Sequence, residues 1–210
     1  MNGTPSAAGK TPPHRFMTPP RIGVLALQGA FAAHSSVLRE LDCRVIEVRV
    51  PADLDGIEAL ILPGGESTTI SHLLASSGLV DAIDERLRNG MPAFGTCAGM
   101  ILLAHAIEDG TTDQRSFNAI DIDVRRNAYG RQVDSFETDI DVVGLDRPFH
   151  AMFIRAPQMT RRGPGVEVLA SMDGDPVLAR EGTVFVASFH PELTHDDRLH
   201  RLFLGSLKEG

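Results

Sequence analysis

The chain has 210 residues, of which 42% are hydrophobic and 23% charged, and its formal charge at pH 7 is −8. This length and composition predict a globular protein of one domain with a buried core. The acidic balance argues against a broad basic surface for nucleic acid, and no apolar run approaches the roughly 20 residues of a membrane span. We therefore expect no nucleic acid and no membrane among its partners.

The beginning of the chain differs in composition from the rest. Residues 1–20 are rich in Pro, Gly, Ser and Thr and contain no hydrophobic block. This pattern predicts a disordered leader rather than a secretory signal, followed by one domain at 21–210. Met17 is an alternative start, which the sequence leaves open. Because the only cysteines are Cys43 and Cys97, we expect a cytoplasmic protein with reduced thiols, in which Cys43 packs in the core.

The first half of the domain alternates short apolar runs with segments of helical spacing, as in a sheet covered by helices. Strands are expected at 22–27, 45–50, 59–62 and 92–95. Helices are expected at 30–41 and 98–106, and over 70–89 as one or two helices with a break near Ser77 and Gly78. No internal repeat or linker interrupts the series.

The second half changes toward alternation of polar and apolar residues, which is typical of strands with one wet face. Strands are expected at 120–124, 138–142, 152–154, 166–171, 176–179 and 184–188, before a closing helix at 196–207. Together the two halves predict a single α/β domain with a mostly parallel central sheet and an antiparallel addition.

The sequence "FGTCAGM" places Cys97 between two glycines, where a predicted strand gives way to a helix. In open α/β sheets ligands gather at this edge, and G-x-C-x-G is a cysteine version of the nucleophile elbow. The first N–H groups of the next helix can stabilise a thiolate and an oxyanion. The alternative for Cys97 is a cysteine that only packs in the core.

A second candidate stretch, "SFHPEL", puts His190 and Glu192 directly after an apolar strand. In an extended segment residues two apart point to the same side, so Glu192 can hold the imidazole of His190 while that ring deprotonates a nucleophile. A surface histidine beside a surface glutamate is the alternative. His190, His195 and His200 are five residues apart, which does not place them on one helical face, and we expect no metal; His195 and His200 are expected to be solvated helix residues.

A third stretch, "LILPGGESTTI", leads from a strand into a glycine pair. Gly64 and Gly65 allow a ligand close to the backbone, and Thr68 or Thr69 can cap the helix that follows. The ending of a phosphate-binding P-loop is missing, and a tight turn without a ligand is the alternative.

Taken together, "LPGGEST", "FGTCAG" and "SFHPEL" resemble the class I glutamine amidotransferases, in which a catalytic triad hydrolyses glutamine to supply ammonia. The stretches "IGVLALQGAFAAH" (22–34), "RRNAYGRQVDSFE" (125–137) and "FIRAP" (153–157) are similar to the glutaminase subunits of pyridoxal phosphate synthases. The resemblance covers nearly everything from Arg21 to about residue 204. It implies a three-layer, flavodoxin-like domain and a glutaminase that needs no cofactor.

By position, the resemblance implies a role for each matched residue. Cys97 matches the nucleophile, His190 the general base and acid, and Glu192 the residue that orients the histidine. The other matched positions are glutamine-binding (Gly64, Gly65, Glu66, Ser67, Arg126, Ile154 and Arg155) or lie at the oxyanion hole and the partner interface (Gly65, Ala98 and Gln28).

The resemblance also implies a partner, the synthase (lyase) subunit, which receives the ammonia and makes pyridoxal phosphate in an assembly of twelve chains of each kind. One departure from the family pattern is a missing glycine- and leucine-rich segment before 120–124, which leaves the loop 109–117 open. The competing functions are a different amidotransferase subunit, a stand-alone cysteine hydrolase for γ-glutamyl substrates, and an inactive scaffold with the same fold.

Overall fold

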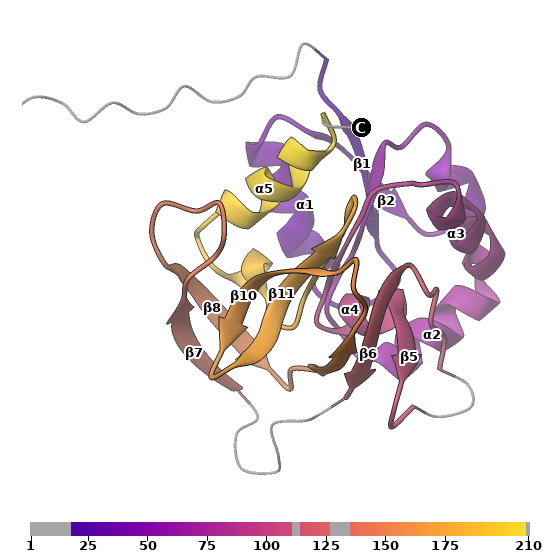
Figure 1. Ribbon diagram of the computed structural model, residues 1–210. Coiled ribbons are helices and arrows are strands. Elements are labelled where there is room, and N and C mark those ends of the chain that lie inside the picture. The colour runs from indigo at the N-terminus through magenta and orange to yellow at the C-terminus, as the bar shows by residue number, and fades with distance from the viewer. Residues whose placement is uncertain (1–17, 111–113, 127–134, 209–210) are drawn as a thin grey trace, which may run out of the picture.

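The computed structural model describes residues 18–110, 114–126 and 135–208 (Figure 1). Its centre is a seven-stranded sheet with the strand order β10-β11-β12-β4-β3-β1-β2. Strands β12, β4, β3, β1 and β2 run parallel, and β11 is antiparallel to both of its neighbours, β12 and β10. The strands are β1 (Arg21–Leu25), β2 (Arg44–Val48), β3 (Ala59–Leu62), β4 (Ala93–Thr96), β10 (Glu167–Met172), β11 (Asp175–Glu181) and β12 (Val184–Ala187).

The parallel strands are apolar along their length because both of their faces are buried. In β3, Leu60 and Leu62 face one hydrophobic cluster, whereas Ala59 and Ile61 face the other. Successive side chains of a strand point to opposite faces, so a run without polar residues is what a covered sheet requires. Fully burying one such leucine or isoleucine contributes about 1.5–3 kcal/mol to the free energy of unfolding.

Helices cover both faces of the sheet, α2 and α3 on one side and α1 and α5 on the other (Figure 1). The short helix α4 follows β4 and packs with the α2 and α3 side. The helices are α1 (Phe31–Glu40), α2 (Ser67–Ser76), α3 (Leu79–Arg88), α4 (Ala98–Leu103) and α5 (Arg198–Ser206), with 3₁₀ turns η1 (Pro51–Leu54) and η2 (Pro191–Leu193). No helix of the described segments is long and apolar enough to cross a membrane.

Two small sheets complete the layers. A three-stranded sheet, β5-β6-β9, adds apolar side chains to the core that faces α2, and the antiparallel pair β7-β8 adds its own to the core that faces α1. These strands are β5 (Ala104–Ile107), β6 (Ile120–Arg125), β7 (Ser135–Ile140), β8 (Phe149–Ile154) and β9 (Gln158–Arg162). The α/β fold with a mostly parallel central sheet and antiparallel strands is thus confirmed.

Several details of the predicted elements were wrong. The strands expected at 22–27 and 138–142 end two residues earlier, at Leu25 and Ile140. The helix expected at 98–106 ends at Leu103, because Ala104 turns to an extended backbone (ψ 158°) and begins β5, which pairs with β6. The strand expected at 45–50 ends at Val48, before η1. Strands β5 and β9 were not predicted, since a short apolar run does not by itself distinguish a strand from a helix.

Candidate active site

Cys97 lies on the tight turn between β4 and α4, with φ 50° and ψ −105°. Such a positive φ is uncommon for a residue with a side chain and costs on the order of 1–3 kcal/mol. The two flanking glycines lie where a side chain has no room. A Cβ on Gly95 would lie 2.5 Å from the carbonyl of Gly99, and a Cβ on Gly99 would overlap the carbonyl oxygen of Leu62. The G-x-C-x-G pattern therefore reflects close backbone contact across the turn and between the turn and β3.

His190 follows β12 and faces the end of that turn. Its backbone N–H donates to the carbonyl of Met152 (2.9 Å), and its ring Nδ1 lies 2.7 Å from Glu192 Oε1 in η2. The side chain of His190 is 9% exposed and that of Glu192 is fully buried. Burial disfavours the charged imidazole, but hydrogen bonding to Cys97 and Glu192 outweighs it and raises the pKa of His190 to about 10.

The segment between β3 and α2 that contains Gly64 and Gly65, the glycine loop, lies against the other side of the His190 ring. A Cβ on Gly64 would overlap the imidazole of His190, and a Cβ on Gly65 would overlap the side-chain oxygen of Gln28. Neither position can therefore carry a side chain, because the backbone at Gly64 lies against the ring of His190 and the backbone at Gly65 lies against the side chain of Gln28.

The helix after this loop is capped differently from the prediction. Thr68 and Thr69 were expected as caps, but the carboxylate of Glu66 accepts hydrogen bonds from their backbone N–H groups (3.1 and 2.6 Å). The helix begins at Ser67, one residue after Glu66, so the two threonines already lie inside its first turn, where their N–H groups lack intrahelical acceptors.

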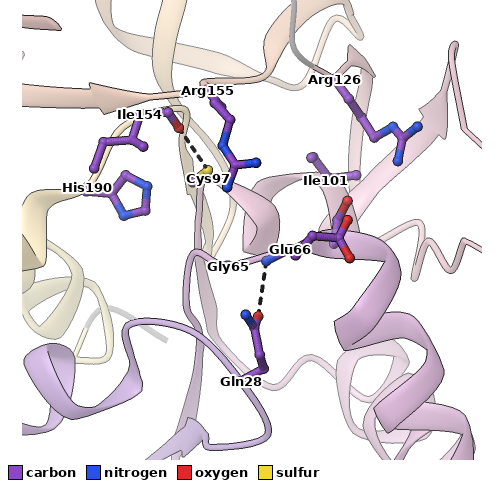
Figure 2. Close-up of a pocket in the computed structure, with 10 residues that line it drawn as sticks. Gln28, Gly65, Glu66, Cys97, Ile101, Arg126, Ile154, Arg155 and His190 are labelled. Carbon is purple, nitrogen blue, oxygen red and sulfur yellow. Dashed lines mark hydrogen bonds between the residues drawn. The ribbon is translucent and has the colours of Figure 1, made fainter. Parts of the chain in front are cut away.

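A pocket of about 230 Å³ opens between these segments (Figure 2). This volume lies below the range of drug-sized sites, which begins at about 300 Å³, and suits a small metabolite. Its lining comes from the segment after β1, the glycine loop and the start of α2, the turn from β4 into α4, and residues at or after the ends of β6, β8 and β12. These residues are Gln28, Gly65, Glu66, Ser67, Cys97, Ile101, Arg126, Ile154, Arg155 and His190.

The pocket brings together most of the residues singled out from the sequence. Of the others, Glu192 lies behind His190, Gly64 lies against its ring, and Ala98 is the first residue of α4. Ile101 lines the pocket but was not predicted, because an apolar residue inside a helix carries no sequence signal of a site.

Two arginines reach this pocket (Figure 2). Arg155 directly follows β8 and has a positive φ of 44°, the second such residue in the lining after Cys97. Arg126 is held by Asp109, whose carboxylate accepts from its backbone N–H (2.8 Å), and by Thr68, whose hydroxyl oxygen accepts from its guanidinium (3.3 Å). The motif at 125–137 continues beyond Arg126 into 127–134, which lie outside the described residues.

The carbonyl of Ile154 and the side chain of Gln28 complete the polar lining. The Cys97 thiol lies 3.8 Å from the carbonyl oxygen of Ile154, and Gln28 Oε1 accepts from the backbone N–H of Glu66 (3.0 Å). Strain at Cys97 and Arg155 and polar groups that converge on one small pocket are features of functional sites.

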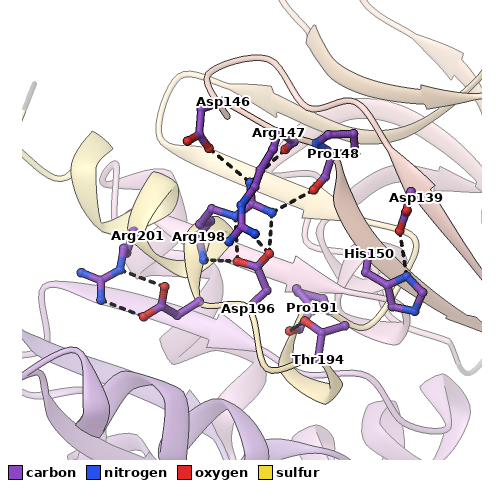
Figure 3. Close-up of polar contacts among 11 residues, drawn as sticks. Asp139, Asp146, Arg147, Pro148, His150, Pro191, Thr194, Asp196, Arg198 and Arg201 are labelled. Carbon is purple, nitrogen blue, oxygen red and sulfur yellow. Dashed lines mark hydrogen bonds and ion pairs between the residues drawn. The ribbon is translucent and has the colours of Figure 1, made fainter. Parts of the chain in front are cut away.

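The segment that carries Glu192 is anchored by an arginine further along the chain (Figure 3). The guanidinium of Arg198, in the first turn of α5, binds the carboxylate of Asp196 and donates to the carbonyls of Arg147 and Pro148 (both 2.9 Å). Because the two carbonyls belong to the connection between β7 and β8, this cluster ties η2 and α5 to that hairpin.

Two of the predictions for histidines need correction. His200 was expected to be a solvated helix residue, yet it is fully buried in α5, with Nε2 2.9 Å from Nδ1 of the equally buried His34. His195 is exposed as expected but lies before α5 rather than in it. His34 was missed; it ends the matched stretch 22–34 but stands far from the other site residues in the chain. The described residues contain no group of three or more His, Cys, Asp and Glu suited to a metal ion.

Comparison with known proteins adds independent information. Residues 24–209 match the model of the SNO glutamine amidotransferase family. A protein of Nocardioides sp. named pyridoxal 5′-phosphate synthase subunit PdxT is 52% identical over 197 residues, which span 91% of this chain and 98% of that protein. The protein of the same name from Herpetosiphon aurantiacus is 54% identical over 187 residues, 88% of this chain and 98% of the relative.

A solved structure is similar as well. The crystal structure of a glutamine amidotransferase matches 89% of this chain and 98% of its own, with a TM-score of 0.84 and 49% identity. The agreement extends over nearly the whole of both chains.

Proposed function

The chain belongs to the SNO glutamine amidotransferase family, and from this premise we propose that it hydrolyses L-glutamine through a triad of Cys97, His190 and Glu192. It is a glutaminase subunit that acts in pyridoxal phosphate synthesis together with a synthase subunit. The observation that carries the triad is the strained Cys97 in one pocket with His190, whose Nδ1 lies 2.7 Å from Glu192.

In the proposed mechanism Cys97 attacks the side-chain carboxamide of glutamine. A protonated His190 beside Cys97 stabilises the thiolate, and the raised pKa of His190, about 10, supports this resting state. The backbone N–H of Ala98, at the start of α4, and the Gly65 region stabilise the oxyanion of the tetrahedral intermediate.

The intermediate then collapses in two steps. His190 gives its proton to the leaving nitrogen, the C–N bond breaks, and ammonia departs from a glutamyl thioester on Cys97. Neutral His190 next takes a proton from water, which attacks the thioester and releases glutamate, and the C–S bond breaks. One glutamine and one water thus give one glutamate and one ammonia, and Glu192 holds the ring of His190 throughout.

The pocket suits the rest of the substrate. Arg126 and Arg155 supply positive charge for the α-carboxylate of glutamine, while Ser67, Glu66 and the carbonyl of Ile154 offer hydrogen-bonding groups. Gln28, bound to the N–H of Glu66, connects the glycine loop to the segment after β1. A rearrangement of this contact when the synthase subunit docks would complete the oxyanion hole.

The ammonia is proposed to pass directly to the synthase subunit, because free ammonia becomes ammonium in water and loses its nucleophilic lone pair. The stoichiometry of twelve synthase and twelve glutaminase chains and the cytoplasmic location are implied by the resemblance and stay predictions. The mass of the purified complex, measured by analytical ultracentrifugation, tests the stoichiometry.

The test of function is ammonia release from glutamine, with and without a pyridoxal phosphate synthase subunit. We expect activity that depends on the partner and falls by several orders of magnitude in Cys97→Ala. Cys43→Ala is the matched control: burial, Asp42 and Glu58 raise the pKa of the Cys43 thiol to about 11, so it is protonated at neutral pH and its loss leaves the rate unchanged. Equal activity without the partner would favour a stand-alone hydrolase, and retained activity in Cys97→Ala would refute the triad.

A further inference from the structure

Behind the proposed triad lies a pair of buried histidines, His34 on α1 and His200 on α5. Both are fully buried, and His34 Nδ1 lies 2.9 Å from His200 Nε2. Apolar side chains pack against the pair: the ring centroid of Phe94 lies 6.1 Å from that of His200. Burying two imidazoles in such a place is unfavourable unless their polar atoms are satisfied. Core packing alone therefore does not account for two histidines at this position.

The pair reaches the carboxylate of the triad. His34 Nε2 lies 3.3 Å from Glu192 Oε2 and 3.1 Å from the hydroxyl of Thr96, the residue before Cys97. The other carboxylate oxygen, Oε1, is the one that binds His190. Among the described residues Oε2 makes no hydrogen bond, and its ion-pair partner is Nε2 of His34, so the two oxygens of Glu192 face two different histidines.

The protonation states of the pair follow from burial. Burial, followed by the effect of His190, lowers the pKa of His34 against the opposing effect of Glu192. Burial and His34 lower the pKa of His200 to about 3. Both rings are therefore neutral near pH 7, and each carries one N–H.

Only one arrangement of these two protons suits the contacts. If His34 carried its proton on Nδ1, its Nε2 lone pair would face the carboxylate of Glu192, and the proton of His200 would have to sit on Nδ1, which has no partner among the described residues. In the opposite arrangement, His200 Nε2–H donates to His34 Nδ1, and His34 Nε2–H donates to the hydroxyl of Thr96, with Glu192 Oε2 3.3 Å from the same nitrogen. The two atoms of this cluster without a hydrogen bond, His200 Nδ1 and Glu192 Oε2, are then both acceptors, and no N–H of the two rings is left without a partner.

We propose that His34 is a positioning residue whose Nε2–H, bound to the hydroxyl of Thr96, also attracts Glu192 Oε2, and that His200 fixes His34 in this tautomer. The contact stops rotation of the carboxylate and keeps Oε1 aimed at His190 Nδ1. A chain of hydrogen bonds then runs from His200 on α5 through His34 on α1 to Thr96, the residue before Cys97. This inference rests on the proposed function, since it assigns His34 a role in orienting the triad.

A measurement on the unaltered chain tests the tautomer. Nitrogen-15 NMR of histidine side chains distinguishes Nδ1–H from Nε2–H rings. We expect the His34 ring to carry its proton on Nε2 and to be neutral at pH 7. An Nδ1–H ring or a charged ring at His34 would overturn the proposal. Because the measurement uses the unaltered chain, it does not depend on whether a variant folds.

Two substitutions test the positioning role in the complex with the synthase subunit. His34→Leu fills much of the space but donates nothing, whereas the amide of His34→Gln can still donate to Glu192. We expect kcat to fall about 10- to 100-fold in His34→Leu with KM changed by less than about 2-fold, and to recover most of its value in His34→Gln. The exposed His105, on β5, serves as the control through His105→Leu, which leaves kcat unchanged.

The rate of Cys97 alkylation by iodoacetamide as a function of pH gives a readout that a merely structural role would not change. The triad residues Cys97, His190 and Glu192 and the histidines His34 and His200 behind them are titratable. The charged groups that line the same pocket are Glu66, Arg126 and Arg155, and they are unchanged in the variant. We expect the alkylation profile of His34→Leu to shift toward higher pH, because a misaligned Glu192 supports the charged His190 less well. A folded His34→Leu protein with the kcat and alkylation profile of the unaltered chain would contradict the inference.

The failures of the two proposals are distinguishable. If Cys97→Ala is inactive and His34→Leu is not impaired, the triad stands and only the positioning role fails. If Cys97→Ala keeps its glutaminase activity, the proposed function itself fails.

Discussion

At the scale of single residues, the site depends on the lack of a side chain at its glycines as much as on its reactive side chains. Gly64 has no side chain at the point where the imidazole of His190 passes, so Gly64→Ala forces the ring away from its position. Since a misplacement of about 1 Å can cost about 100-fold in rate, we expect kcat/KM for glutamine to fall by at least about that factor. Measured in the complex with the synthase subunit, an unchanged kcat/KM would contradict this placement of the ring.

The matched control is a glycine with free space around it. A Cβ on Gly205, in α5, meets nothing within 4 Å, and its backbone is helical. Gly205→Ala should therefore leave the rate unchanged and raise the free energy of unfolding by up to about 1 kcal/mol.

The same scale shows what the sequence can predict about a site. Cys97 lies in G-x-C-x-G, and His190 and Glu192 lie in His-Pro-Glu. In each motif the neighbouring residues determine the local backbone that orients these side chains, so the sequence alone is enough to identify them as candidates. His34 and His200 are separated by 166 residues and meet only because α1 and α5 pack on the same face of the sheet. Nothing in the local sequence of either one indicates that contact.

At the scale of elements, the start of α2 combines a structural and a proposed functional role. Glu66 accepts from the hydroxyl of Thr69 and from the backbone N–H groups of Thr69 and Thr68, and these bonds lower its pKa to about 2 although burial opposes the shift. The carboxylate thus stabilises the helix when it is ionised. We expect Glu66→Ala to lower the free energy of unfolding by about 1 kcal/mol at pH 7, measured by urea denaturation.

The pH dependence of this cap has a definite sign. Because the pKa of Glu66 is lower in the folded chain than its ordinary value of 4.5, its contribution is complete above that pH and is lost as the pH falls from 4.5 toward about 2. The difference between Glu66→Ala and the unaltered chain should shrink accordingly. Glu85→Ala, an exposed change within α3, should stay within about 0.5 kcal/mol at each pH. A difference that is constant from pH 6 to 3 would show that ionised Glu66 does not stabilise the helix.

The type of an element could be predicted where the sequence showed a helical or strand periodicity of apolar residues, or a glycine that interrupts a helix. The break between α2 and α3 falls at Ser77 and Gly78 as predicted, since Gly78 takes a left-handed backbone there. The end of α4 was not predictable in the same way. The residues of α4 and β5 form one apolar run, and only the pairing of β5 with β6, a tertiary contact, decides where the helix stops.

At the scale of the whole molecule, fold class followed from the alternation of buried strands and helices, but the strand order did not. The antiparallel addition was expected as one feature, whereas the structure distributes it over β10 and β11, the β5-β6-β9 sheet and the β7-β8 pair. These pairings join segments that are distant in the chain, and they are selected by which face of the central sheet each strand can cover. That choice depends on the assembled core rather than on local propensity.

The boundary of the domain gives the last prediction. The first strand, β1, lies between β2 and β3, and the backbone N–H of Arg44 donates to the carbonyl of Pro20 (2.9 Å) at the edge of that pairing. A chain that starts at Met17 keeps all of these bonds, so we expect it to unfold within about 1 °C of the full chain and to retain its glutaminase activity. A chain that starts at Gly23 loses Ile22, which pairs with Val45 on one side and Ala59 on the other.

Removal of such a core isoleucine costs about 2–5 kcal/mol, which corresponds to a decrease in Tm of at least about 4 °C for a domain of this size. Differential scanning calorimetry of the three chains measures both effects. The proposal that the amidotransferase domain occupies 21–210 requires the first truncation to be silent and the second to be destabilising, because the sheet begins between the two cut points. An equal loss in both chains would mean that residues before Met17 contribute to the folded domain and that its boundary lies earlier.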